Sequence, residues 1–165
     1  MIRDVVDFPS EGITFKDITP ILGHGPSFGA AIGALAAPWE DKNVAKVLGI
    51  EARGFLLGAP VADRLGAGFV PVRKPGKLPV EVLGADYVLE YGTDRLEVHR
   101  DSVAPGERVV IIDDVLATGG TAAAAVRLAS ALGAELVGLG FFLEIEALRG
   151  RDRLEGQVLA TVVRC

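Results

Sequence analysis

Residues 109–121 read Val-Val-Ile-Ile-Asp-Asp-Val-Leu-Ala-Thr-Gly-Gly-Thr, and this stretch decides the fold. Its first four residues are β-branched and apolar, so they predict a buried strand. Asp113 and Asp114 follow directly, and we expect both carboxylates to reach solvent at the frayed carboxyl end of that strand. Open α/β sheets bind ligands at this edge. The strand, its turn and the helix-like residues 122–132 therefore predict an α/β fold with a ligand site.

The turn after the two acids is suited to a phosphate group. Backbone N–H groups at the start of a helix, together with the helix dipole, favour an anion. The glycines allow the backbone to approach a ligand closely, the threonines add hydroxyl donors, and the second threonine is a candidate N-cap. No lysine lies in the turn, so it lacks the P-loop pattern of nucleotide triphosphatases. The sequence predicts a sugar-phosphate site, the alternative being an ordinary strand-turn-helix with two solvated acids. The turn residues are Ala117, Thr118, Gly119, Gly120 and Thr121.

Strand-like and helix-like segments alternate along the rest of the chain, which favours βαβ units and a mostly parallel twisted sheet flanked by helices. The segment at residues 73–84 is polar and rich in proline and glycine, and we expect a mobile loop there. Alternating residues at 87–91 and 95–99 predict a projecting antiparallel hairpin. The whole chain, residues 1–165, is expected to form one domain. The other predicted strands are residues 44–50, 69–72, 136–143 and 156–163, and the other predicted helices are residues 26–37 and 54–65.

Composition excludes several classes of protein. The chain is 50% hydrophobic but only 6% aromatic, so its core is aliphatic, and 24% of its residues are charged, as in ordinary soluble domains. The formal net charge of −5 disfavours a nucleic-acid partner. Apolar runs are too short for a membrane helix. A single cysteine, Cys165, rules out an intrachain disulfide and, with no signal peptide visible, agrees with a cytoplasmic location.

Two further turns carry residues suited to anions. Glu51, Ala52, Arg53 and Gly54 follow an apolar strand and open a helix. Here Arg53 is a fixed cation, the alternative being a surface ion pair. Downstream, the three cations Arg73, Lys74 and Lys77 follow another strand end. Alone they would suit a solvated loop, but beside two anion-binding turns they are better explained as ligands of a phosphate group.

Four segments together resemble the type I phosphoribosyltransferase family, and more narrowly its adenine-specific branch. The stretch quoted first resembles the family's 5-phosphoribosyl-1-pyrophosphate (PRPP) motif. The resemblance covers nearly the whole chain and implies the family's fold, with a flexible hood formed by the loop and hairpin at about residues 74–100. The other three segments are residues 8–18 (Phe-Pro-Ser-Glu-Gly-Ile-Thr-Phe-Lys-Asp-Ile), residues 51–55 (Glu-Ala-Arg-Gly-Phe), and residues 73–79 (Arg-Lys-Pro-Gly-Lys-Leu-Pro) with residues 89–92 (Leu-Glu-Tyr-Gly).

The resemblance implies a role for each segment. The turn at residues 117–121 would bind the 5′-phosphate of PRPP, and Asp113 and Asp114 would hold the ribose hydroxyls. The segments at Glu51 and Arg73 would bind diphosphate, with a non-proline cis peptide in the first. Near the base, Phe15 would stack on the purine, although a plain core position explains it equally well. The full set expected around the base is Thr14, Phe15, Lys16 and Ile145.

The catalytic residues implied are Glu90, Tyr91 and Arg53. In a closed, dry site the pKa of Glu90 would rise, which suits a general base for the purine proton. On the pattern alone, Glu90 is also explained as the solvent-facing member of an alternating strand. Ile145 is likewise explained by ordinary core packing.

The implied activity is transfer of the phosphoribosyl group from PRPP to adenine. Mg²⁺ is the implied cofactor, bound mainly through the substrate with help from Asp113 and Asp114. A homodimer is expected from family analogy. Two alternatives stay open: a PRPP- or purine-sensing regulator on the same fold, and an enzyme for another base. Family members often carry an additional segment before Asp7, and we expect activity not to depend on it.

Overall fold

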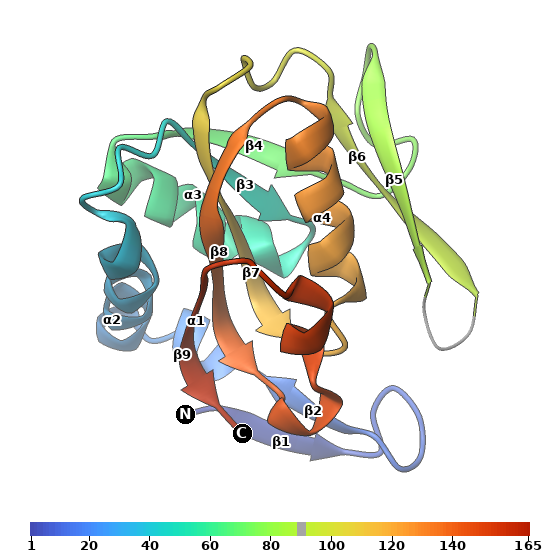
Figure 1. Ribbon diagram of the computed structural model, residues 1–165. Helices are drawn as coiled ribbons and strands as arrows, with labels where there is room; N and C mark the ends of the chain where they lie inside the picture. The colour runs from blue at the N-terminus through green and yellow to red at the C-terminus, as the bar shows by residue number, and fades with distance from the viewer. Residues whose placement is uncertain (89–91) are drawn as a thin grey trace.

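The computed structural model describes residues 1–88 and 92–165 and centres on a five-stranded sheet of order β4-β3-β7-β8-β9 (Figure 1). Every neighbouring pair in this sheet is parallel, which confirms the predicted parallel sheet. The parallel arrangement brings the carboxyl-terminal parts of β3 and β7 to the same edge of the sheet, and proposed site residues lie in β7 and directly after β3 and β7. The strands are β3 (Lys46–Ile50), β4 (Gly68–Val72), β7 (Arg108–Leu116), β8 (Glu135–Glu144) and β9 (Leu159–Arg164).

Alternating apolar side chains divide the core into two halves, one on each face of the sheet. Val47 and Val110 face one layer, whereas Leu48 and Val109 on the same strands face the other. The first layer contains α1 (Thr19–Leu22), α2 (Gly25–Ala36) and α3 (Arg53–Leu65), and the second contains α4 (Gly120–Ala131). Short 3₁₀ turns complete the chain: η1 (Ala37–Trp39), η2 (Glu146–Leu148) and η3 (Gly150–Leu154).

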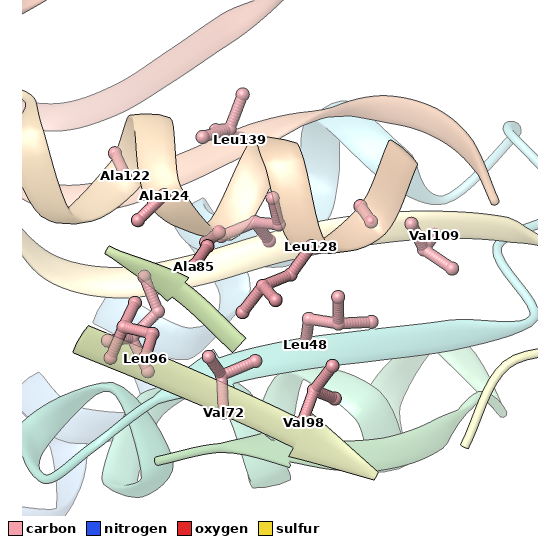
Figure 2. Close-up of a cluster of buried hydrophobic side chains, with 14 of the residues drawn as sticks. Leu48, Val72, Ala85, Leu96, Val98, Val109, Ala122, Ala124, Leu128 and Leu139 are labelled. Atoms are coloured by element: carbon pink, nitrogen blue, oxygen red, sulfur yellow. The ribbon is translucent and has the colours of Figure 1, made fainter. Parts of the chain in front are cut away.

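The predicted hairpin is present as β5 (Val82–Val88) paired antiparallel with β6 (Thr93–His99). Its inner face packs beside α4, and Figure 2 shows Ala85, Leu96 and Val98 close to Leu128. The predicted loop at residues 73–84 was too long, because residues 82–84 pair with β6. A second hairpin, β1 (Arg3–Val6) with β2 (Thr14–Asp17), was not predicted and lies near both chain ends in Figure 1.

Strand β7 extends past the point at which the sequence predicted it to end. It continues to Leu116, because β8 pairs with it as far as Leu116 opposite Glu144. Asp113 and Asp114 therefore lie within the strand, and Asp114 is only 5% exposed. The expectation of a frayed end was wrong, as was that of a solvated Asp114, whereas Asp113 is half-buried and lines both pockets.

No helix in residues 1–88 and 92–165 combines the length and the apolar character needed to cross a membrane.

Candidate active site

The phosphate-sized turn lies between β7 and α4 and encloses a pocket of about 70 Å³, lined by Asp113 and the residues from Val115 to Ala122. Gly119 makes the turn, with a left-handed backbone (φ 80°), and is the N-cap of α4. Thr121 was predicted as the N-cap, and this was wrong, because the N-cap is Gly119 and Thr121 already lies inside α4, which begins at Gly120. The first N–H groups of a helix have no partner within it, so they are available to an anion here.

A larger cavity of about 360 Å³ joins this turn to the loop after β3. The two pockets share Asp113, Val115, Ala117 and Thr121, so they form one continuous site. The structure thus brings together residues more than 60 positions apart, because β3 and β7 are parallel neighbours. The lining residues are Glu51, Ala52, Arg53, Lys74, Tyr87, Asp113, Asp114, Val115, Ala117 and Thr121.

The two aspartates are held in a largely buried setting. Asp113 Oδ1 accepts a hydrogen bond from the backbone N–H of Asp114 at 2.8 Å. Burial, and then the adjacent Asp114 charge, raise the pKa of Asp113 well above its ordinary value. Burial also raises the pKa of Asp114, although Arg53 opposes this shift. The pair therefore favours a ligand that supplies positive charge or hydroxyl donors.

Arg53 lies at the start of α3, with its Nε 2.8 Å from Asp114 Oδ2. Within the described parts of the chain no donor meets hydrogen-bond geometry with that buried oxygen, so the adjacent charge of Arg53 is what compensates it. The guanidinium also lies 5.0 Å from the centre of the Phe15 ring. Arg53 is therefore in an ion pair, but its partner Asp114 is only 8% exposed and both residues line the cavity, so a role for Arg53 toward an anion stays a prediction.

The Glu51-Ala52 peptide bond is cis, as the family resemblance implied. The next glycine is sterically required: a Cβ on Gly54 would lie 2.9 Å from Asp113 Oδ1 and 3.0 Å from the Ile112 carbonyl oxygen. Only glycine lets α3 begin this close to β7. The loop after β3 is thereby held directly against the aspartate pair.

The three cations after β4 do not all face the cavity. Lys74 lines the cavity, whereas Arg73 Nε (2.9 Å) and Lys77 Nζ (2.8 Å) bind the carboxylate of Glu51. Burial alone would raise the pKa of Glu51, but Lys77 and Arg73 more than offset this and lower it. Glu51 thus holds two cations at the edge of the cavity.

Lys74 is bound by two hairpin residues that the sequence analysis did not select. Its Nζ donates to Tyr87 Oη at 2.5 Å and to Asp94, and Tyr87 Oη donates to Asp94 at 3.0 Å. The alternation of the hairpin could have indicated them, because Tyr87 is on its buried face. These contacts attach the hood to the cavity.

The residues expected around the base are only partly assembled. Phe15 on β2 packs edge-to-face on Phe8 at 5.3 Å and faces Arg53. Lys16 is on the other face of β2, with Nζ 2.9 Å from Asp4 Oδ1, so it points away from Phe15. None of Thr14, Phe15, Lys16 and Ile145 lines the cavity, so their role at the base stays a prediction. Glu90 and Tyr91 lie outside the described residues.

The carboxylates of the site limit how it could hold a metal ion. Within residues 1–88 and 92–165, no group of three or more His, Cys, Asp or Glu side chains is arranged to hold one. Among the described residues that line the cavity, three carry carboxylates, and that of Glu51 is already bound by Arg73 and Lys77, which leaves those of Asp113 and Asp114. This donor set suits Mg²⁺ only if water and substrate oxygens complete its coordination.

Comparison with known proteins gives a consistent result. Residues 21–161 match the model of the phosphoribosyl transferase domain family. The adenine phosphoribosyltransferase of Myxococcus xanthus is 55% identical over 98% of this chain and 88% of its own length. That of Acidothermus cellulolyticus is 54% identical over 99% of this chain and 92% of its own.

Solved structures agree with these relatives. The crystal structure of adenine phosphoribosyltransferase from Thermoanaerobacter pseudethanolicus superposes with a TM-score of 0.97 at 50% identity, covering 100% of this chain and 96% of that one. The Rhodothermus marinus enzyme gives 0.95 at 53% identity, covering 99% and 94%. The chain therefore has the type I phosphoribosyltransferase fold and belongs to the phosphoribosyl transferase domain family, within its adenine phosphoribosyltransferase branch.

Proposed function

We propose that this protein transfers the 5-phosphoribosyl group from PRPP to N9 of adenine and releases AMP and diphosphate. The observation that carries the proposal is the single cavity in which Asp113 and Asp114 lie between the phosphate turn and the Glu51 loop. The relatives named above, similar over nearly the whole chain, carry the adenine phosphoribosyltransferase name.

The cavity suggests how the substrate would lie. The 5′-phosphate would bind at the turn of residues 117–121, which lines the small pocket and leads into α4, whose first N–H groups lack helical partners. Its ribose hydroxyls would donate to Asp113 and Asp114, whose buried carboxylates need such partners. The diphosphate would lie toward Arg53 and Lys74, with Arg73 and Lys77 at the cavity edge. Binding of PRPP at both ends would fix its anomeric carbon between them.

In the reaction, N9 of adenine bonds to the anomeric carbon while the bond from that carbon to the diphosphate oxygen breaks. Negative charge grows on the departing diphosphate, and fixed cations stabilise this charge in the transition state. The purine proton would pass to Glu90, with Tyr91 beside it, and the purine would lie near Phe15. Holding both reactants in one orientation supplies much of the remaining rate enhancement.

Mg²⁺ is the proposed cofactor. Asp113 and Asp114 would hold it through waters and substrate oxygens, because both residues line the cavity beside the phosphate turn. Once bound to PRPP, Mg²⁺ would offset part of the diphosphate charge. A homodimer and a cytoplasmic location are further proposals, supported by family analogy and by the composition.

The test is product formation with PRPP and Mg²⁺ and each of adenine, hypoxanthine, xanthine and orotate in turn. We expect AMP from adenine and much slower turnover with the others. Faster turnover with another base would replace the proposed acceptor. Tight PRPP binding without turnover of any base would instead identify a PRPP-sensing protein.

A further inference from the structure

We propose that Gly150 and the Glu144–Arg151 ion pair are positioning residues for the 5′-phosphate turn. Glu144 ends β8, and Gly150 and Arg151 follow it, about 30 residues beyond that turn; none of the three lines the cavity. The inference rests on the proposed function, because it assigns the turn to the 5′-phosphate of PRPP.

The first observation is the closeness of two backbones. A Cβ on Gly119 would lie 2.4 Å from the carbonyl oxygen of Gly150, and a Cβ on Gly150 would lie 2.2 Å from that of Ala117. Distances this short leave no room for a side chain on either residue. Gly150 therefore packs directly against the backbone of the turn, and it is not among the residues that line either pocket.

The second observation is the ion pair next to Gly150, between Glu144 and Arg151. Arg151 donates to Glu144 through Nε at 2.6 Å and through Nη2 at 2.8 Å. The Glu144 side chain is only 6% exposed, and the bond from Arg151 lowers its pKa. Because the contact is bidentate, it holds the Arg151 side chain in one orientation. Arg151 directly follows Gly150, so the contact also restricts the position of the Gly150 backbone.

The segment is anchored at both ends. At its start, the backbone N–H of Ile145 donates to the Leu116 carbonyl oxygen at 3.0 Å, just before the turn. At its end, Leu154 is 3% exposed and packs in the same core half as α4. The segment from Ile145 to Leu154 is thus fixed at both ends, and Gly150, which contacts the turn, lies between these two fixed points.

This arrangement has a specific consequence for binding. The turn contributes backbone N–H groups, whose value depends on their direction, and a displacement of about 1 Å can cost on the order of 100-fold in an enzyme site. A methyl group on Gly150 must displace the Ala117 carbonyl, and so the turn. We expect weaker binding of the 5′-phosphate and unchanged binding of diphosphate, whose proposed ligands lie on other loops.

The experiment measures the dissociation constants of ribose 5-phosphate and of inorganic diphosphate by titration calorimetry, with the midpoint of thermal unfolding measured in parallel. Gly150→Ala should weaken ribose 5-phosphate binding by at least about tenfold and leave diphosphate binding within about twofold. Gly29→Ala is the matched control, because that exposed helical glycine has nothing within 4 Å of its would-be Cβ. It should change neither constant.

Arg151 provides a second test that does not depend on the fold tolerating an alanine at Gly150. Arg151→Gln should weaken ribose 5-phosphate binding, and Arg151→Lys, which keeps the charge, should recover part of the loss. Lower thermal stability with unchanged ribose 5-phosphate binding in the variants would show a purely structural role and overturn the inference. If the unaltered protein fails to bind ribose 5-phosphate, the proposed function falls as well.

Discussion

Replacing Glu51 with glutamine should destabilise the ligand-free protein and yet increase its affinity for diphosphate. Glu51 is 6% exposed and accepts from Arg73 Nε at 2.9 Å and Lys77 Nζ at 2.8 Å. If Arg73 and Lys77 also bind diphosphate, Glu51 competes with the ligand for them. Removing the charge of Glu51 should then destabilise the ligand-free protein and leave Arg73 and Lys77 free to bind diphosphate more tightly.

The magnitude follows from the burial of the three side chains. Breaking a fully buried ion pair costs about 3–5 kcal/mol, because it leaves an uncompensated charge. Arg73 and Lys77 are 34% and 50% exposed, so water solvates them once Glu51 is neutral. We therefore expect a loss of about 1–2 kcal/mol. For a chain of this size, that lowers the unfolding midpoint by about 2–8 °C.

The free energy that Glu51→Gln removes from the stability of the ligand-free protein should be gained as binding free energy for diphosphate. A difference of about 1–2 kcal/mol corresponds to about 5- to 30-fold tighter diphosphate binding. The assay is calorimetric titration of both proteins with inorganic diphosphate, with thermal unfolding in its presence and absence. Because the pKa of Glu51 is lowered on folding, its stabilising effect is present above the pKa of the unfolded chain. The stability difference between the two proteins should therefore disappear as the pH falls through the folded pKa.

Glu107 offers a matched control for this prediction. It pairs with Lys46 at 3.2 Å, and neither residue lines the cavity. Glu107→Gln should lower stability without changing diphosphate affinity. If Glu51→Gln binds diphosphate more weakly than the unaltered protein does, the competition argument is refuted, and Glu51 serves instead to hold its two cations in place for the ligand.

Three further predictions concern other parts of the molecule. Asp114→Asn should lower the turnover of adenine with PRPP by at least about 100-fold, because it removes a charge that we propose holds the ribose hydroxyls. His99→Ala should leave turnover within about twofold, and similar losses for the two variants in steady-state assays would undo the assignment of the site. Phe15→Leu should raise the KM for adenine more than the KM for PRPP, and equal changes would place Phe15 in the core only. The pKa of Asp17 is lowered to about 2 by bonds from the Thr19 backbone and Arg3. The contribution of Asp17 to stability should be fully present above about pH 4 and be lost as the pH falls toward about 2. The free energy of unfolding in urea should therefore depend less on pH in Asp17→Asn over that range. An unchanged pH dependence would contradict the assignment.

Much of the fold was predictable because the local signals agree with one another. The apolar run before Asp113, the glycine turn and the alanine-rich segment each have a strong intrinsic preference, and the structure contains the strand, turn and helix they predict. The parallel sheet follows from the alternation of such segments. The first hairpin, β1 with β2, was missed because short strands beside a turn give a weak periodic pattern.

The errors occurred where a neighbouring strand decides the outcome. β7 continues to Leu116 because β8 runs beside it, and this pairing partner is 20 or more residues away in sequence. The same pairing buries Asp114, which the sequence pattern had placed in solvent. Helix α4 begins at Gly120 rather than at a threonine because Gly119 adopts a left-handed backbone that lets it lie against Gly150.

By itself, the sequence determined the fold class, the order of the elements and the residue types that surround a phosphate-sized turn. Backbone preferences and apolar periodicity are local, so they can be deduced from consecutive residues. Only the tertiary structure decided which charges meet: Arg53 with Asp114, Glu51 with Arg73 and Lys77, and Lys74 with Asp94. Such contacts depend on distance and burial between elements remote in the chain, and it is these two quantities that set the strength of a charge interaction.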